Sequence, residues 1–113
     1  MSARNALLAA PPYAVERAIK SLGFNIKTAR IRRNLTRSDV AEKIGVNRRV
    51  VADAENGKPS TAIAVYVGLL WALDLVDQLS PVADPAKDAE GSALALARAP
   101  SKVRKAEILD NDF

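Results

Sequence analysis

The residues best suited to chemistry are two adjacent arginines, Arg48 and Arg49, with Asp53 following in the next helical turn. Apolar residues lie among them at helical spacings, which predicts a helix over residues 48–55 with an inner face of Val50, Val51 and Ala54. Both arginines would then face outward, where a guanidinium can donate two parallel hydrogen bonds to an anionic or planar acceptor. A solvated basic face is the alternative interpretation of the same residues.

Several other kinds of chemistry are excluded by the composition. The 113-residue chain has no Cys and no His, which removes disulfides, cysteine-based zinc sites and the commonest general base. Its 13 Asp and Glu form no pair near a plausible substrate pocket. We therefore expect no enzymatic activity, no cofactor and no metal site.

The positive charge is concentrated in the first half of the chain. Residues 1–60 carry twelve Lys and Arg against five Asp and Glu, whereas residues 61–113 carry five against eight. A basic half joined to a mildly acidic half is typical of a phosphate-binding surface on one side of a molecule.

Two short helices with clear boundaries precede and include the two arginines. Thr36 is expected to cap the first, with Asp39 three residues on as in a capping box, and Gly45 ends it. Gly45 stands where we expect a side chain to clash. Asn47 is expected to cap the second helix, and the turn at residues 56–59 closes it.

The segment before these helices is also helical in pattern. Apolar spacing predicts a helix from Tyr13 that Gly23 weakens or bends, followed by a second helical stretch over residues 24–33. Ile31 is expected to face inward in that stretch, and Asn34 to end it in the left-handed conformation.

Residues 61–75, capped by Ser60, form a predicted helix that is apolar nearly all round. Tyr66, Leu70 and Trp71 are its large central residues. Such a helix must be buried on several sides, and a domain of about 65 ordered residues cannot enclose it completely. We therefore predict a homodimer formed through this helix, with a simple core position as the alternative for Trp71.

The chain divides into three parts by composition. Residues 1–12 are predicted to be a flexible arm, residues 13–83 one helical domain, and residues 84–113 a flexible tail that could bind a partner. The fold class expected is all-α. No apolar run reaches the roughly 20 residues that span a bilayer, so we expect a cytoplasmic protein.

The segment over residues 36–57 resembles the Xre/lambdoid-repressor family of helix-turn-helix regulators, and the resemblance extends over roughly residues 22–75. The matching elements are Leu35-Thr36, Val40-Ala41, Gly45-Val46 and Glu55-Asn56-Gly57-Lys58. The resemblance implies a five-helix, lambda-repressor-like DNA-binding and dimerisation domain. Members usually carry Gln after the Thr, and here that position is Arg37.

The resemblance also implies roles for individual residues. Base contacts would come from Arg48, Arg49 and Asp53, which favours an operator containing G·C pairs because Arg binds guanine and Asp accepts from cytosine. Phosphate contacts would come from Arg37, Asn47 and Lys58. Arg30 and Glu55 would form a buried ion pair.

A narrower resemblance concerns the HipB-like antitoxins within this family. It depends on the order of the helix around Trp71, the sequence Ala83-Asp84-Pro85, and a basic-then-acidic end that includes Leu109 and Phe113. It implies a nucleoid-associated repressor that binds double-stranded DNA at a palindromic operator and neutralises a HipA-like kinase toxin. A phage-type or metabolic repressor without a toxin is the alternative, and a protein-bridging module is a third possibility, which the outward arginine pair disfavours.

Overall fold

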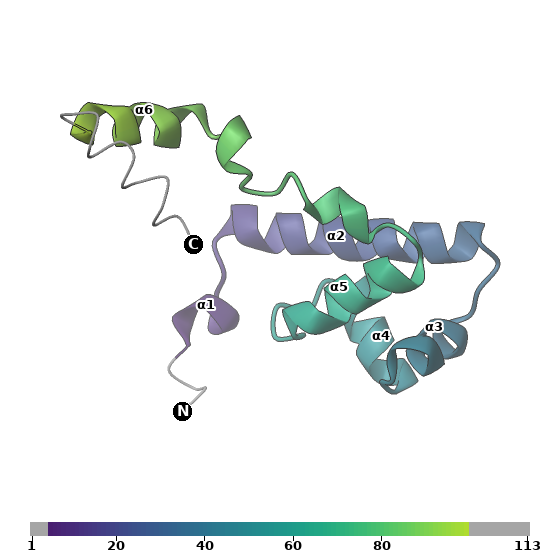
Figure 1. Cartoon of the computed structure of the whole chain (residues 1–113). Helices are drawn as coiled ribbons and strands as arrows, with labels where there is room; N and C mark the ends of the chain where they lie inside the picture. Colours follow the sequence, from purple (N-terminus) through teal and green to yellow (C-terminus); the bar gives the residue numbers. More distant parts are fainter. Residues whose placement is uncertain (1–4, 100–113) are drawn as a thin grey trace. The chain divides into compact units, whose positions relative to one another are not determined.

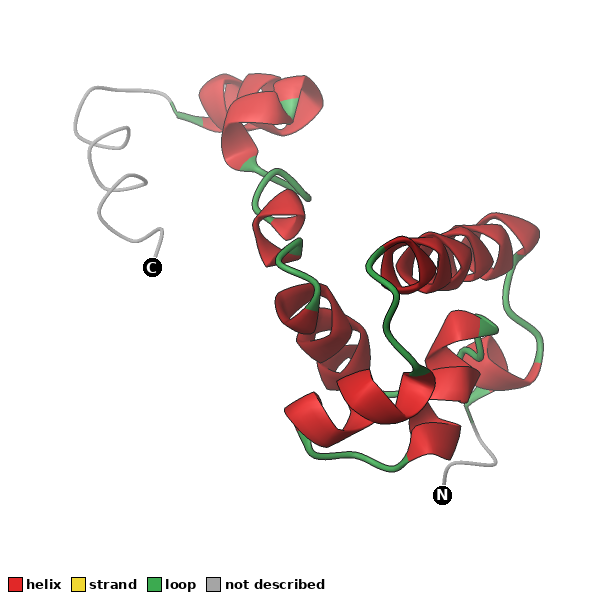
Figure 2. Cartoon of the chain, turned by 90° about the vertical axis from the view of Figure 1, so that its right-hand side faces the viewer, coloured by secondary structure: helices red, strands yellow, loops and turns green. Residues whose placement is uncertain are grey.

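A computed structural model of the chain describes residues 5–99, and every regular element in that range is helical (Figures 1 and 2). The all-α prediction is confirmed. The chain forms two compact units, Met1–Asp77 and Gln78–Phe113. The elements in chain order are α1 (Ala6–Ala9), α2 (Tyr13–Arg32), α3 (Arg37–Ile44), α4 (Arg48–Glu55), α5 (Ile63–Ala72), the 3₁₀ turns η2 (Val76–Leu79) and η3 (Pro85–Lys87), and α6 (Ala89–Arg98).

Helix α2 is one continuous helix of 20 residues (Figure 1), so the predicted division into two helical stretches at Gly23 is wrong. Gly23 is buried where α2 meets α4, and a Cβ there would press on the carbonyl oxygens of Ala54 and Glu55. The glycine thus lets two helices approach each other rather than ending one. Asn34 follows α2 with φ 57°, which confirms the predicted left-handed terminator.

Two helical glycines give opposite predictions for substitution by alanine. Gly23→Ala should destabilise the fold by about 1–3 kcal/mol, because the new methyl group would lie 2.7 Å from the Glu55 carbonyl oxygen. Gly68→Ala in α5 should be neutral or stabilise by up to about 1 kcal/mol, because its Cβ would meet the Ile44 side chain at an ordinary 3.6 Å. Urea unfolding of both variants checks this, and equal effects would contradict the packing argument.

The core lies where α2, α3, α4 and α5 meet. Its largest fully buried side chains are Ile26, Val40, Val51, Leu69 and Leu73. These residues come from all four helices and from the residue after α5, so each helix contributes an apolar side to one shared interior. Burial of this kind is the main stabilising term of a small helical domain.

Helix α5 is shorter than predicted and is not enclosed on every side. It begins at Ile63 after Ala62, without a side-chain cap, so the predicted cap at Ser60 is wrong. Tyr66 and Leu70 are buried, but Trp71 is 54% exposed and is not a core aromatic. Ile31, predicted to face inward, is also exposed because it lies beyond the side of α2 that packs on α4 and α5.

The described part of the second unit is largely helical, although the sequence predicted a flexible tail from residue 84. Asp84 Oδ1 accepts a hydrogen bond from the Ala86 amide at 2.9 Å, and Asp88 Oδ1 accepts one from Gly91 at 2.9 Å. These aspartates cap η3 and α6, and α6 is rich in alanine and leucine. Similarly, α1 lies within the predicted arm. Residues 1–4 and 100–113 lie outside the described range.

Candidate nucleic-acid interface

The start of α3 is fixed by the predicted capping box. The Thr36 hydroxyl accepts from the Asp39 amide at 3.0 Å, and the Asp39 carboxylate accepts from the Thr36 amide at 2.8 Å. The hydrogen bond that the Thr36 amide donates to its carboxylate lowers the pKa of Asp39 below its ordinary value. The box is confirmed, and it satisfies two amide groups that would otherwise lack partners at the helix start.

Gly45 ends α3 for a different reason from the one predicted. Its φ is 79°, in the left-handed region, and a Cβ there would meet nothing within 4 Å. Glycine is therefore favoured at this position by the left-handed backbone conformation, and a steric clash plays no part. Asn47 then caps α4, since its Oδ1 accepts from the Val50 amide at 3.0 Å. This confirms the predicted cap and leaves the side-chain NH₂ group as the donor for any phosphate.

Helix α4 divides cleanly between a buried and an exposed side. Val51 and Ala54 are fully buried, whereas Arg48 and Arg49 are exposed in the first turn. Asp53 is half-buried, and its Oδ2 lies 3.8 Å from the ammonium nitrogen of Lys58. Two predicted DNA-contacting residues therefore neighbour each other, with opposite charges at the end of α4.

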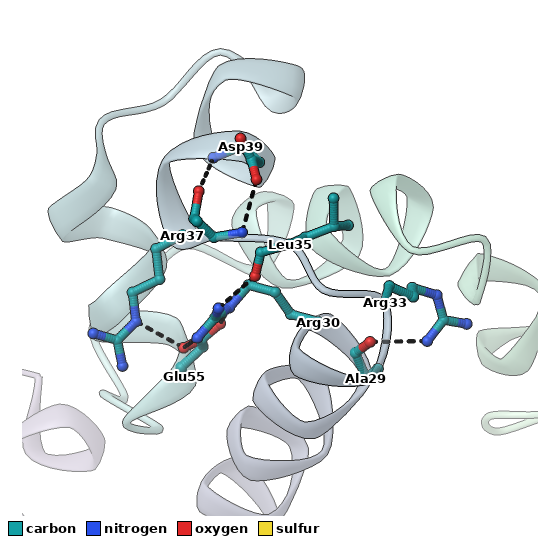
Figure 3. A network of polar contacts seen from close by, with 8 residues as sticks. Ala29, Arg30, Arg33, Leu35, Arg37, Asp39 and Glu55 are labelled. Atoms are coloured by element: carbon teal, nitrogen blue, oxygen red, sulfur yellow. Dashed lines mark hydrogen bonds and ion pairs between the residues drawn. The ribbon is translucent and has the colours of Figure 1, made fainter.

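The structure brings Arg30 and Glu55 together, the two residues predicted to form an ion pair (Figure 3). Arg30 Nε donates to Glu55 Oε2 at 2.6 Å, and Arg30 Nη2 donates to Oε1 at 3.1 Å. Arg30 Nη1 also donates to the Leu35 carbonyl at 2.8 Å. The end of α2 is thereby joined both to the end of α4 and to the loop that leads into α3.

Arg37 is a second partner of Glu55, which the sequence did not reveal. Its Nε donates to Glu55 Oε1 at 2.9 Å, while its two terminal nitrogens point away from Glu55 (Figure 3). The predicted phosphate contact therefore has only those terminal nitrogens to use. The two residues are 18 positions apart, so no local pattern could have indicated their contact.

The Glu55 side chain has no exposed surface, and it is the common acceptor of both arginines. Burial raises the pKa of Glu55, but the hydrogen bonds and charges of Arg30 and Arg37 outweigh that effect and hold it below its ordinary value. Glu55 is therefore ionised at neutral pH. The Arg30–Glu55–Arg37 cluster sets the position of α3 relative to α4.

A shallow hollow of about 290 Å³ lies beside this cluster, at the start of α3. Arg30, Arg37 and Arg48 line it together with Thr36 and Ser38. Three guanidinium groups with one carboxylate leave a net positive charge, which favours an anion such as a phosphate. The structure thus groups Arg48 with Arg37 as well as with its neighbour Arg49.

The sequence of this part of the chain matches a known protein family. Residues 26–70 match the family model described as helix-turn-helix. The matched residues include all of α3 and α4 and the turn between them. A comparison with curated proteins gives no match.

The match covers the whole of the predicted two-helix segment, residues 36–57. Within residues 5–99, no helix is long and apolar enough to cross a membrane. No group of three or more acidic residues with the geometry of a metal site occurs in the same range.

Proposed function

We propose that the chain is a sequence-specific repressor in which α4 enters the major groove of DNA. The observation that carries this proposal is the pair Arg48 and Arg49, exposed in the first turn of a helix whose far end is fixed by Glu55. The first turn of a recognition helix is the part that contacts base edges. Arg48, Arg49 and Asp53 would address bases, and the phosphate contacts would come from the terminal nitrogens of Arg37, from Asn47 and from Lys58.

The second part of the proposal is a homodimer formed through α5. Ile63 and Trp71, eight residues apart on this helix, are 70% and 54% exposed, and their side chains leave the helix about 80° from each other. Large apolar side chains are costly to leave in water, and a second copy would cover them. Lys43 lies 5.5 Å from the centre of the Trp71 ring, so the indole already has a cationic neighbour from α3. Two recognition helices related by a twofold axis would read a palindromic operator.

The third part is a role as the antitoxin of a toxin–antitoxin pair in the cytoplasm. It depends on the resemblance of the chain to HipB-like antitoxins, which implies a HipA-like kinase as the partner. The predicted partner segment includes Leu109 and Phe113, which lie outside the described residues. A segment that carries apolar residues among acids can bind a partner through both kinds of side chain.

Purification of the tagged full chain from its native host would test all three parts. We expect a dimer that carries palindromic DNA fragments and a kinase-like protein, identified by DNA sequencing and mass spectrometry. DNA without a protein partner would leave a plain repressor and exclude the antitoxin role. A monomer at micromolar concentration would contradict the dimer, and random DNA sequences would contradict specific binding.

A double variant and a matched control would test the proposed dimer separately from DNA binding. Trp71→Ser with Ile63→Ser should shift the protein to a monomer in analytical ultracentrifugation, while Leu94→Ser, at a similarly exposed leucine of the second unit, should not. A monomer loses the second recognition helix, so operator affinity should fall by about 100-fold or more. An unchanged dimer in the double variant would place the interface elsewhere.

A further inference from the structure

The outward side of α2 carries three large apolar residues in one line. Tyr13, Phe24 and Ile31 are 74%, 65% and 56% exposed. They are separated by 11 and 7 residues, and at 3.6 residues per turn their side chains leave the helix within about 20° of one another. A soluble protein seldom aligns exposed aromatic and aliphatic residues in this way without a partner for them.

Basic residues alternate with these apolar residues along the same side. Arg17 and Lys20 lie between Tyr13 and Phe24, and Lys27 lies between Phe24 and Ile31. We call this set of six residues the outer stripe. It occupies about 80° of the helix circumference, and a shallow hollow of about 450 Å³ lies between its two aromatic residues.

The positive charge of the outer stripe is largely uncompensated. Lys20 lies 4.0 Å from Glu16 in an exposed pair, which is worth little in water. Among residues 5–99, no carboxylate lies within 4.0 Å of the charged groups of Arg17 or Lys27. The stripe therefore combines exposed apolar surface with cationic groups, two of which, Arg17 and Lys27, have no such carboxylate partner within residues 5–99.

This surface is separate from the candidate nucleic-acid interface. The side of α2 that packs on the other helices, centred on Gly23, Ile26 and Arg30, lies about 105° around the helix from the centre of the outer stripe. The helix-turn-helix match begins at residue 26, so four of the six stripe residues precede it. The function of the DNA-binding domain does not account for them.

We propose that the outer stripe binds an acidic amphipathic helix of a partner protein. The six residues follow one another at spacings of four, three, four, three and four, which is the heptad spacing of helices that pack side by side. The stripe spans 18 residue steps, or about 27 Å, enough for some five turns of a partner helix. Apolar partner residues would cover Tyr13, Phe24 and Ile31, and Asp or Glu would meet the bases.

Two other occupants fit the stripe less well. A second copy of the same side would place Arg17, Lys20 and Lys27 against other cations, and like charges in contact oppose association. A DNA backbone would pair with the cations but would leave Phe24 and Ile31 without an apolar partner. The proposal is independent of the proposed DNA-binding function.

The test uses the full chain and two fluorescent synthetic peptides of about three heptads. Both carry leucine at the same heptad positions, with Glu flanking the leucines in one peptide and Lys in the other. Fluorescence anisotropy should show the Glu peptide binding at least about tenfold more tightly than the Lys peptide. Phe24→Ser should weaken the Glu peptide about tenfold or more, and Arg17→Glu with Lys27→Glu should reverse the preference between the peptides.

Arg32→Glu is the matched control, because Arg32 is exposed on the same helix but outside the stripe. It should leave binding of the Glu peptide within about twofold of wild type. Absence of binding, or equal binding by wild type and the Phe24 variant, would overturn the proposal. So would a loss of affinity for duplex DNA in the charge-reversed variant with no change in peptide binding, since the stripe would then belong to a DNA surface.

Discussion

Glu55→Gln should lower the free energy of unfolding by about 3–5 kcal/mol. The side chain is fully buried and accepts hydrogen bonds from Arg30 and Arg37, so removing its charge leaves two guanidinium groups facing a neutral amide. Removing one partner of a buried ionic cluster is much more costly than its net contribution suggests, because the remaining charges lose their compensation. Thermal unfolding should show a decrease in Tm of roughly 12 °C or more.

Glu16→Gln is the matched control for this variant. Glu16 also has a cationic neighbour, Lys20, but the pair is exposed and its atoms are 4.0 Å apart. The same substitution there should change stability by no more than about 0.5 kcal/mol. Equal effects at positions 16 and 55 would show that the buried cluster contributes nothing beyond a surface pair.

The pH dependence of stability provides a second measurement on the same variant. The pKa of Glu55 lies below its ordinary value of 4.5 in the folded state, so its contribution is complete above about pH 4.5 and is lost as the pH falls through the folded-state pKa. The wild type should therefore lose stability in acid more steeply than Glu55→Gln, which has no proton to bind there. Parallel pH profiles would contradict the lowered pKa.

A variant of Arg37 tests whether the three residues of the Arg30–Glu55–Arg37 cluster stabilise the domain together. Arg37→Met keeps the Arg30–Glu55 pair and an aliphatic chain of similar length, but it removes the link from Glu55 to α3. The loss of stability should be smaller than for Glu55→Gln, because the carboxylate keeps one guanidinium partner. Arg37 stands where the Xre family that this segment resembles usually has Gln, and the structure gives the added charge a partner inside the domain.

Local features of the helix-turn-helix could be predicted because neighbouring residues determine them. The caps at Thr36 and Asn47 depend on an amide three residues away, and the left-handed residues Asn34 and Gly45 depend on their own backbone conformation. Such features are visible in a sequence window of four residues. They were sufficient to locate α3 and α4 within a residue or two.

Features that depend on distant contacts could not be predicted in the same way. Gly23 was expected to weaken or bend the helix, but its role comes from carbonyl groups of α4 more than 30 positions later. The pairing of Arg37 with Glu55 likewise depends on how α3 crosses α4. The exposure of Trp71 depends on which side of α5 meets the core, and a helix apolar on every side has no periodicity that could indicate it.

Arg48→Ala with Arg49→Ala should reduce affinity for the operator by about 100-fold or more while leaving the fold intact. Each bidentate contact of an arginine with guanine contributes roughly 1–3 kcal/mol to discrimination between bases, so two contacts account for about 2–6 kcal/mol. Both side chains are exposed and form no ion pair with another described residue, so the Tm should change little. The probes are the DNA sequences recovered with the purified protein.

A charge-matched control separates base recognition from general attraction to DNA. Lys87→Ala with Arg98→Ala removes the same two positive charges from exposed positions of the second unit. It should retain the preference for operator over random DNA, although nonspecific affinity at low salt should decrease slightly. If the two double variants behave alike, Arg48 and Arg49 contribute only net charge, and the assignment of α4 as the recognition helix is wrong.

The single variants should then distinguish the two arginines from each other. Arg48 lines the hollow that Arg37 and Arg30 also line, whereas Arg49 does not. If Arg48 binds a phosphate there, Arg48→Ala should weaken all DNA sequences alike and reduce the slope of affinity against salt by about one. Arg49→Ala should instead relax the preference at one base pair and leave the salt slope nearly unchanged, because a base contact releases no counterion. If Arg48 instead contacts a base, as proposed above, Arg48→Ala should also relax the preference at one base pair and leave the salt slope nearly unchanged.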